Sequence, residues 1–257
     1  MIPFFRKIRK KMADDNKPMR YARYAIGEIL LVVIGILIAL QINNWNENRK
    51  DSRAETNLLM GLQNEFKINL EEIDSAIDLN QKNVDACFRI TELIRENSLE
   101  KQTVTLDSLL GRLGILASFD ARRAVTDEII NSGKLDILRN DALRVLITRW
   151  PALLEEAKED IGFTVNNYNN NLMPFLIDNF PLANAEITKK WQNNKIRMYS
   201  NTSSFSTNFS DLNMMKFESV IWHHKHNIDF LLGNDYELKE TINTIISAIK
   251  KALTDKN

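Results

Sequence analysis

One strongly apolar stretch constrains the fold of this chain more than any other feature. It covers residues 24–42 and reads YAIGEILLVVIGILIALQI, with no polar side chain from Ile29 to Leu40. As a helix it would be about 28 Å long, close to the roughly 30 Å hydrocarbon core of a bilayer. Glu28 and Gln41 lie near its ends, where polar groups cost less than at the centre. The stretch therefore predicts a transmembrane helix at 24–42, against the alternative of a buried helix in a soluble core.

The charges beside this stretch predict its orientation. Residues 1–24 carry eight lysine or arginine and two acidic side chains, a net charge of +6, in a chain whose formal net charge is zero. Basic flanks stay in the cytoplasm. Residues 1–23 are therefore expected to be cytoplasmic and residues 43–257 to form a helical extracytoplasmic domain. This pattern favours an uncleaved signal-anchor in the inner (cytoplasmic) membrane, with a periplasmic domain, over a cleaved signal peptide.

The basic segment itself has an amphipathic pattern. Residues 3–12 read PFFRKIRKKM, and their apolar side chains share one face of a helix. The cations of this segment are Arg6, Lys7, Arg9, Lys10 and Lys11. Such a helix binds the anionic lipid of the cytoplasmic leaflet. The alternative is a basic tail that only sets the topology.

The rest of the chain has the composition of one globular domain. The composition favours helices, because the whole sequence has only eight glycines and five prolines. No alternating strand pattern persists for more than a few residues. We therefore predict an all-α fold, in which the transmembrane helix precedes a bundle of long antiparallel helices. The zero net charge argues against nucleic acid as a partner. The single cysteine, Cys87, excludes an intrachain disulfide and is expected to be a small core residue.

Apolar residues after the membrane stretch recur at steps of three, four or seven, as they do on amphipathic helices. No proline lies between Pro18 and Pro151, so the sequence allows the membrane helix to continue, unbroken or nearly so, from Trp45 to about Asn97. It leaves open whether the two segments form one helix. The apolar stripe of this long helix comprises Leu59, Leu62, Phe66, Leu70, Ile73, Ile77, Val84, Cys87 or Phe88, and Ile94.

Capping residues predict two shorter helices after it. Residues 98–104 are expected to form a loop. Thr105 is a candidate N-cap for a helix over 106–116, and Asp120 is a candidate N-cap for a helix that ends near residue 130.

A second long helix is expected in the middle of the chain. Gly133 should end the preceding helix in a left-handed conformation, and Asn140 or Asp141 should begin the long one. Pro151 is expected either to kink this helix or to open a new one. Near Pro174 the helix is expected to be kinked or to end. Its inner side would carry Leu143, Leu146, Ile147, Trp150, Leu154, Ala157, Ile161, Val165, Tyr168, Leu172 and Phe175.

The last third of the chain predicts two helices and an irregular segment. Residues 181–210 are polar and are expected to be irregular, with one turn at 187–191. Asp211 should open a helix, Gly233-Asn234 should turn the chain, and a final helix should follow. The apolar positions of this pair are Met215, Val220, Ile221, Ile228 and Leu231, then Leu238, Ile242, Ile245, Ile249 and Leu253.

Two stretches together resemble a known family. They are FFRKIRKKM with RYAIGEILLVVIGILIALQINNWNE, and AVTDEIINSGKLDILRNDALRVLITRW. The chain resembles, over essentially its whole length, an uncharacterised family of single-pass membrane proteins widespread in Bacteroidota. The resemblance implies an inner-membrane protein with a helical soluble domain. It implies no activity and no catalytic residue.

The histidines are the best candidates for chemistry. All three lie in Trp222-His223-His224-Lys225-His226. His223 and His226 are three residues apart and share a helical face with Asp229, a spacing that would suit a metal-dependent enzyme. Because a zinc site needs three or four well-placed ligands, the simpler interpretation is a partly exposed helical surface. We therefore assign no catalytic, cofactor or metal residue and expect no cofactor.

The leading functional hypothesis is a non-catalytic interaction or sensor module held at the membrane. Two alternatives remain open: a membrane-bound metal-dependent enzyme that uses the His223–His226 cluster, and an accessory subunit of a membrane complex. A homo-oligomer is a further expectation, because Gly35 and Ala39 form one pair of small residues through which membrane helices approach closely.

Overall fold

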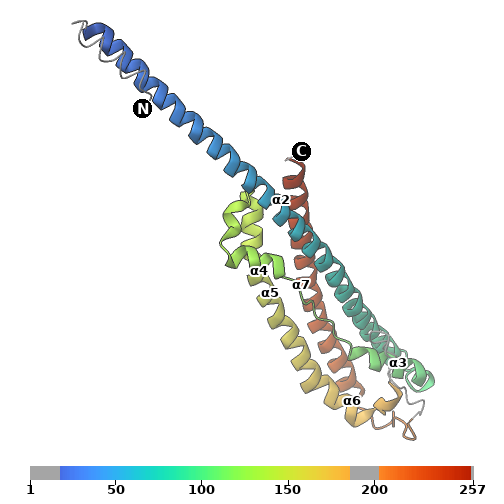
Figure 1. The fold of residues 1–257 in the computed structure, drawn as a ribbon. Helices are drawn as coiled ribbons and strands as arrows, with labels where there is room; N and C mark the ends of the chain where they lie inside the picture. Colours follow the sequence, from blue (N-terminus) through green and yellow to red (C-terminus); the bar gives the residue numbers. More distant parts are fainter. Residues whose placement is uncertain (1–17, 186–202, 256–257) are drawn as a thin grey trace. The chain divides into compact units, whose positions relative to one another are not determined.

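The computed structural model describes residues 18–185 and 203–255, and the side chains from residue 25 onward within them. The chain divides into two compact units, Met1–Asn57 and Leu58–Asn257. Every regular element in the described residues is helical (Figure 1), which confirms the all-α prediction.

Helix α2, Pro18–Arg95, contains the apolar stretch and continues beyond it without a break, which decides the point that the sequence left open. Between Ile29 and Leu40 its large apolar side chains are 45–74% exposed, so this stretch is not buried within its own unit. In the described residues this is one helix long and apolar enough to cross a membrane. Asn97 ends it with a positive φ of 49°. The N–H groups of Asn97 and Ser98 bond back to the carbonyls of Ile94 and Leu93, which is the Schellman arrangement.

The unit Leu58–Asn257 is built on three long helical segments. They are the C-terminal part of α2, α5 (Asp141–Asn167) and α7 (Met214–Thr254). Shorter α-helices lie between them: α3 (Thr103–Leu113), α4 (Ala124–Asn131) and α6 (Met173–Asn179). One-turn helices occupy Glu100–Gln102, Lys134–Ile137 and Leu182–Asn184, and a π-helical turn, Tyr168–Leu172, joins α5 to α6.

Pairs of contacts give the helix directions. Lys239 pairs with Asp74 and Glu218 pairs with Arg95, so α7 runs antiparallel to α2. Asn234 bonds to Asp160, and the Asn227 carbonyl accepts from Thr164, so α7 is also antiparallel to α5. It follows that α2 and α5 run parallel (Figure 1). A parallel neighbour requires the chain to return to the start of the bundle between them.

Two hydrophobic clusters fill this unit. One lies between α2, α5 and α7 and contains Trp150 and Phe66 with ring centroids 5.3 Å apart. The other joins the end of α2 to α3, α6 and the start of α7, and contains Phe217 stacked on Phe175. The predicted α2 stripe contributes to both. Cys87 is 1% exposed whereas Phe88 is 44% exposed, which decides between the two and confirms Cys87 as a core residue.

Several predicted boundaries are confirmed and others are wrong. Gly133 has a φ of +71°, and the Asn140 side chain caps α5 by accepting from the Leu143 N–H, both as expected. Helix α3 already begins at Thr103, so Thr105 lies inside it and is not its cap. Helix α4 begins at Ala124, so Asp120 does not cap it. The cap of α4 comes from another helix, as described below.

The predicted turn at Gly233-Asn234 is wrong, because α7 runs unbroken through both residues. A glycine costs a helix about 1 kcal/mol relative to alanine. Ile228, Leu232 and Leu238 are buried on both sides of it and stabilise the continuous helix by more than that. Asn234 contributes too, since its side chain bonds to Asp160 on α5.

The predicted inner faces of α5 and α7 also need correction. Pro151 lies inside a continuous α5, so it does not open a new helix. Val165 is exposed because Thr164 takes the inward position instead. Helix α7 begins at Met214, capped by Asn213, and Met215 points to solvent. Leu146 and Ile161 are half-buried. The turn expected at 187–191 lies outside the described residues.

Candidate functional site

A stripe of polar side chains on α2 is the most unusual feature of the folded unit. Glu65, Asn69, Asn80 and Asn83 are each no more than 5% exposed, although they lie on a helix packed into the core. At 100° per residue, these positions fall within an arc of about 60°. Buried polar groups need hydrogen-bond partners, so the stripe must face a segment that supplies them. We call these four residues the polar stripe.

The three asparagines of the stripe bind an extended segment, residues 114–123, which we call the connector. Asn69 holds Arg122 by both backbone groups, accepting from its N–H at 2.7 Å and donating to its carbonyl at 2.9 Å. Asn80 does the same with Ala117, at 3.0 Å for each bond. Asn83 donates to the carbonyls of Leu113 and Ile115. An amide side chain can donate and accept at once, so it replaces the strand partner that the connector lacks.

The spacing of the stripe matches the rise of the connector. Asn69 and Asn80 are separated by 11 residues, which is about 16.5 Å at 1.5 Å per helical residue. Their partners, Arg122 and Ala117, are separated by five residues, also about 16.5 Å at 3.3 Å per extended residue. Eleven residues are close to three full helical turns, so both asparagines face the same way. The connector therefore runs alongside α2 with its bonding groups in step with the asparagines, and it returns the chain to the start of the bundle.

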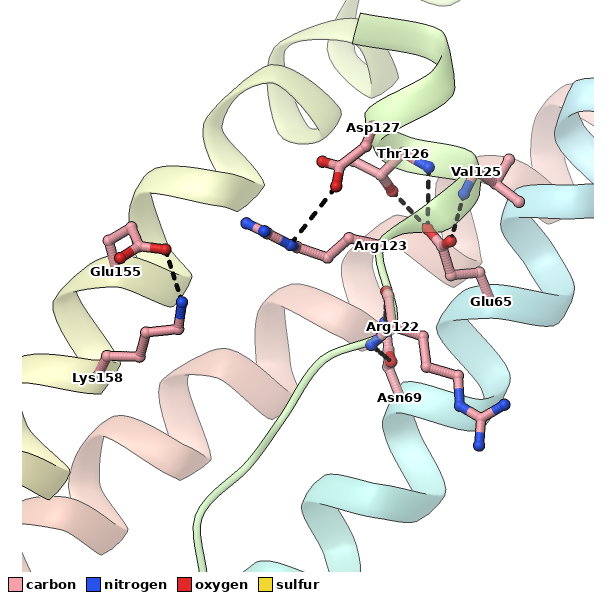
Figure 2. A network of polar contacts seen from close by, with 9 residues as sticks. All are labelled: Glu65, Asn69, Arg122, Arg123, Val125, Thr126, Asp127, Glu155 and Lys158. Carbon is pink, nitrogen blue, oxygen red and sulfur yellow. Dashed lines mark hydrogen bonds and ion pairs between the residues drawn. The ribbon is translucent and has the colours of Figure 1, made fainter. Parts of the chain in front are cut away.

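Glu65 supplies the missing N-terminal cap of α4 (Figure 2). Its carboxylate accepts from the N–H of Val125 at 2.6 Å, from the N–H of Thr126 at 3.1 Å and from the Thr126 hydroxyl at 2.6 Å. These N–H groups belong to the first turn of α4, where no residue of α4 itself provides a side-chain cap. A carboxylate also suits the positive end of the helix dipole. The cap that the sequence placed at Asp120 thus comes from α2.

The surface around the Glu65 cap carries ordinary ion pairs. Arg122 pairs with Glu72 at 3.1 Å. Arg123 approaches Asp127 at 3.8 Å (Figure 2). The side chains of these residues are at least one-third exposed, so each pair contributes little to stability. The buried bonds of the polar stripe are what fix the connector.

Helix α7 brings one titratable group to the polar stripe and another to the end of α3. Asn80 donates to Asp235 at 3.4 Å, and burial raises the pKa of Asp235 to about 6, against the smaller opposing effect of that hydrogen bond. His224 lies 3.2 Å from the Leu113 carbonyl through Nε2. Because a carbonyl only accepts, Nε2 carries the proton. Burial lowers the pKa of His224 to about 4, so the ring is neutral at pH 7.

A close contact at the π-helical turn completes this region. The Tyr168 ring lies 5.6 Å from the His224 ring. Gly114, the first connector residue, faces the Tyr168 hydroxyl so closely that a Cβ there would lie 2.7 Å from it. Glycine at this position therefore lets the chain leave α3 in close contact with the tyrosine hydroxyl. The tyrosine itself lies at the start of the π-helical turn, an element that is rare in helices.

Asp235 makes the stability of this region depend on pH. Its pKa is raised in the folded protein, so stability falls as the pH rises from about 4 to 6. Asparagine cannot ionise, and we expect Asp235→Asn to raise the free energy of unfolding by about 1–3 kcal/mol at pH 8 and to lose that advantage near pH 4. Chemical unfolding of the full-length protein in detergent, followed by circular dichroism at both pH values, measures the difference.

The opposite pH dependence of His224 is common to both proteins and cancels from this comparison. Asp178→Asn is the matched control, since Asp178 is exposed, and it should show no such pH-dependent gain. An Asp235→Asn effect of equal size at pH 4 and pH 8 would contradict the assigned titration.

The structure separates the three histidines that the sequence grouped. His224 is buried, whereas His223 and His226 are exposed. Asp229, the third candidate ligand, pairs instead with Lys225, whose ammonium lies 4.7 Å from the Phe88 ring centroid. In the described part of the chain no group of three or more histidine, cysteine or carboxylate side chains is placed to hold a metal ion. The thiol of Cys87 is buried, which raises its pKa to about 12.

Sequence reasoning missed the polar stripe. A signal was present, because Asn69, Asn80 and Asn83 occupy positions next to the apolar stripe, where a solvated face would not be expected. What the sequence could not provide was the partner, since the bonds of the stripe to residues 112–126 join positions 29 to 61 apart and the bond from Asn80 to Asp235 joins positions 155 apart.

Comparisons with known proteins find a similar family for part of the chain. No curated protein and no solved structure matches it. One family model matches residues 28–155, which include most of the apolar stretch, the polar stripe, the connector and the first half of α5. Over residues 28–155, the chain is similar to a family of unknown function (DUF6090), in agreement with the resemblance to an uncharacterised family.

Proposed function

We propose that this protein is a single-pass membrane protein whose helical domain is a non-catalytic interaction or sensor module. The observation that carries the proposal is the apolar stretch of α2. Its side chains from Ile29 to Leu40 are exposed along the whole run, and a bilayer is the environment that would bury them. The domain after it has hydrophobic clusters of its own.

The proposed orientation has a cytoplasmic N-terminus and a periplasmic domain at the inner membrane. The net charge of +6 on residues 1–24 supports it. In this arrangement Arg6, Lys7, Arg9, Lys10 and Lys11 contact the anionic cytoplasmic leaflet. These five residues lie outside the described part of the chain, so their contact with lipid rests on the sequence pattern.

A pair of reporter fusions tests this topology. Alkaline phosphatase, which is active only outside the cytoplasm, is fused after Asn257, and a fluorescent protein that matures in the cytoplasm is fused at the same point. We expect an active phosphatase and a dark fluorescent fusion. Replacing the five basic residues of the 6–11 segment with glutamine should shift a fraction of the molecules to the opposite orientation. The reverse pattern in the unaltered protein would overturn the assignment.

A further inference from the structure

A groove between α5 and α7 has the chemistry of a binding site for a charged helix. It encloses about 450 Å³. Its apolar floor is formed by Leu146, Leu153, Ala157 and Leu238. Its rim carries the carboxylates of Glu156, Glu159, Asp160 and Glu237 and a single cation, Arg149.

The charges on this rim are not neutralised by side chains in the described part of the domain. Asp160 accepts a hydrogen bond from Asn234, which is neutral. Glu156, Glu159 and Glu237 form no ion pair with any described residue, and neither does Arg149. Their neighbour Glu155, which points away from the groove, does pair with Lys158 at 2.8 Å. Four carboxylates against one guanidinium leave the groove with a net charge of −3.

An occupant of this groove needs an apolar face flanked by cations. The groove follows α5 from Leu146 to Asp160, which is about 21 Å and equals the length of a helix of about 14 residues. Amphipathic helices bind such grooves by apolar side chains at steps of three and four. Basic residues beside that stripe would face the carboxylates of the rim. We propose that the α5–α7 groove binds a basic amphipathic helix of a partner protein on the same side of the membrane as the domain.

This inference rests on the proposed interaction role and specifies its partner. Electrostatic complementarity mainly sets the specificity and the rate of association. Binding should therefore weaken as salt rises, because exposed charges are screened over about 8 Å at physiological ionic strength.

A peptide titration tests the proposal on the full-length protein. The protein is reconstituted in nanodiscs of phosphatidylcholine, which has no net charge, and both faces of the disc are open to solution. The probe is a fluorescein-labelled 14-residue peptide with leucine at steps of three and four and lysine elsewhere, followed by fluorescence anisotropy. A peptide with the same leucines and glutamate in place of lysine is the control for apolar contact alone, and empty nanodiscs control for lipid binding.

Variants locate the binding on the molecule. We expect Glu156→Gln with Glu237→Gln to weaken binding of the lysine peptide by roughly tenfold, because two exposed charge pairs are lost. Glu240→Gln removes an exposed carboxylate from the same helix, α7, but outside the groove, and should leave the affinity unchanged. Circular dichroism melting of all variants should match the unaltered protein, since the replaced carboxylates are exposed and form no ion pair with another described residue.

Three outcomes would overturn the proposal. They are equal affinity for the lysine and glutamate peptides, equal affinity of the groove variant and the Glu240→Gln control, and a groove-dependent dimer that forms without peptide, which would make a second copy the occupant. Because both disc faces are accessible, the binding result does not depend on the orientation that the reporter fusions test. Failure of one proposal is thus distinguishable from failure of the other.

Discussion

Replacing Glu65 with alanine is expected to lower the free energy of unfolding by about 3 kcal/mol, the largest effect we expect from a single change outside the apolar core. The carboxylate accepts three hydrogen bonds from the first turn of α4, and Thr126, which donates two of them, is fully buried. Alanine would leave two backbone N–H groups without a cap and would create a cavity where the carboxylate lay. Urea unfolding of the full-length protein in detergent, followed by far-ultraviolet circular dichroism, measures the loss.

Two companion variants separate the causes of this loss. Glu65→Gln keeps one acceptor oxygen but removes the charge at the helix N-terminus, so its loss should be intermediate. Glu71→Ala, which removes an exposed carboxylate one and a half turns further along α2, should change stability by no more than about 0.5 kcal/mol. If Glu65→Ala were as stable as the Glu71→Ala control, the Glu65 cap of α4 would not contribute to stability.

Replacing Ile34 with arginine should release much of the protein from the membrane. Arginine at the centre of a transmembrane helix costs about 3 kcal/mol, and the central aliphatic residues together contribute about 3–6 kcal/mol to insertion. The substitution thus removes at least half of the driving force and changes the insertion equilibrium by more than about a hundredfold. Extraction of membranes at alkaline pH measures the soluble fraction.

Ile34→Leu is the control for this variant, because it keeps the hydrophobicity and should remain in the membrane fraction. An arginine variant that stays fully in that fraction would mean that residues 24–42 are not what retains the protein.

The sequence predicted those parts of the fold that depend on neighbouring residues. The apolar stripe of α2, the left-handed Gly133 and the Asn140 cap all follow from spacing or from local backbone requirements, and each is confirmed. The same local reasoning failed at Gly233, where glycine and asparagine usually mark a turn. There the apolar periodicity continues across the pair, and burial on both sides outweighs the local preference.

The candidate site depends on contacts between residues far apart in the sequence, so it could not be predicted from local patterns. Asp120 was a reasonable cap by local rules, but the carboxylate that bonds to the first turn of α4 is that of Glu65, 60 positions before Val125. Likewise, the sequence grouped three histidines by proximity in the chain, whereas helical geometry buries His224 and leaves His223 and His226 exposed. Neither a tertiary cap nor the direction of a side chain can be read from composition.

The pairing of an extended chain with a helix also limits how this domain can change in length. Asn69 and Asn80 meet their partners only because 11 helical residues advance as far as five extended ones. A single-residue insertion between the two asparagines would rotate one of them by about 100° away from the connector. A deletion between Ala117 and Arg122 would leave about 3.3 Å that the chain cannot stretch to cover. Insertions and deletions in relatives that keep this arrangement should therefore fall outside residues 69–83 and 113–126, at the ends of the bundle.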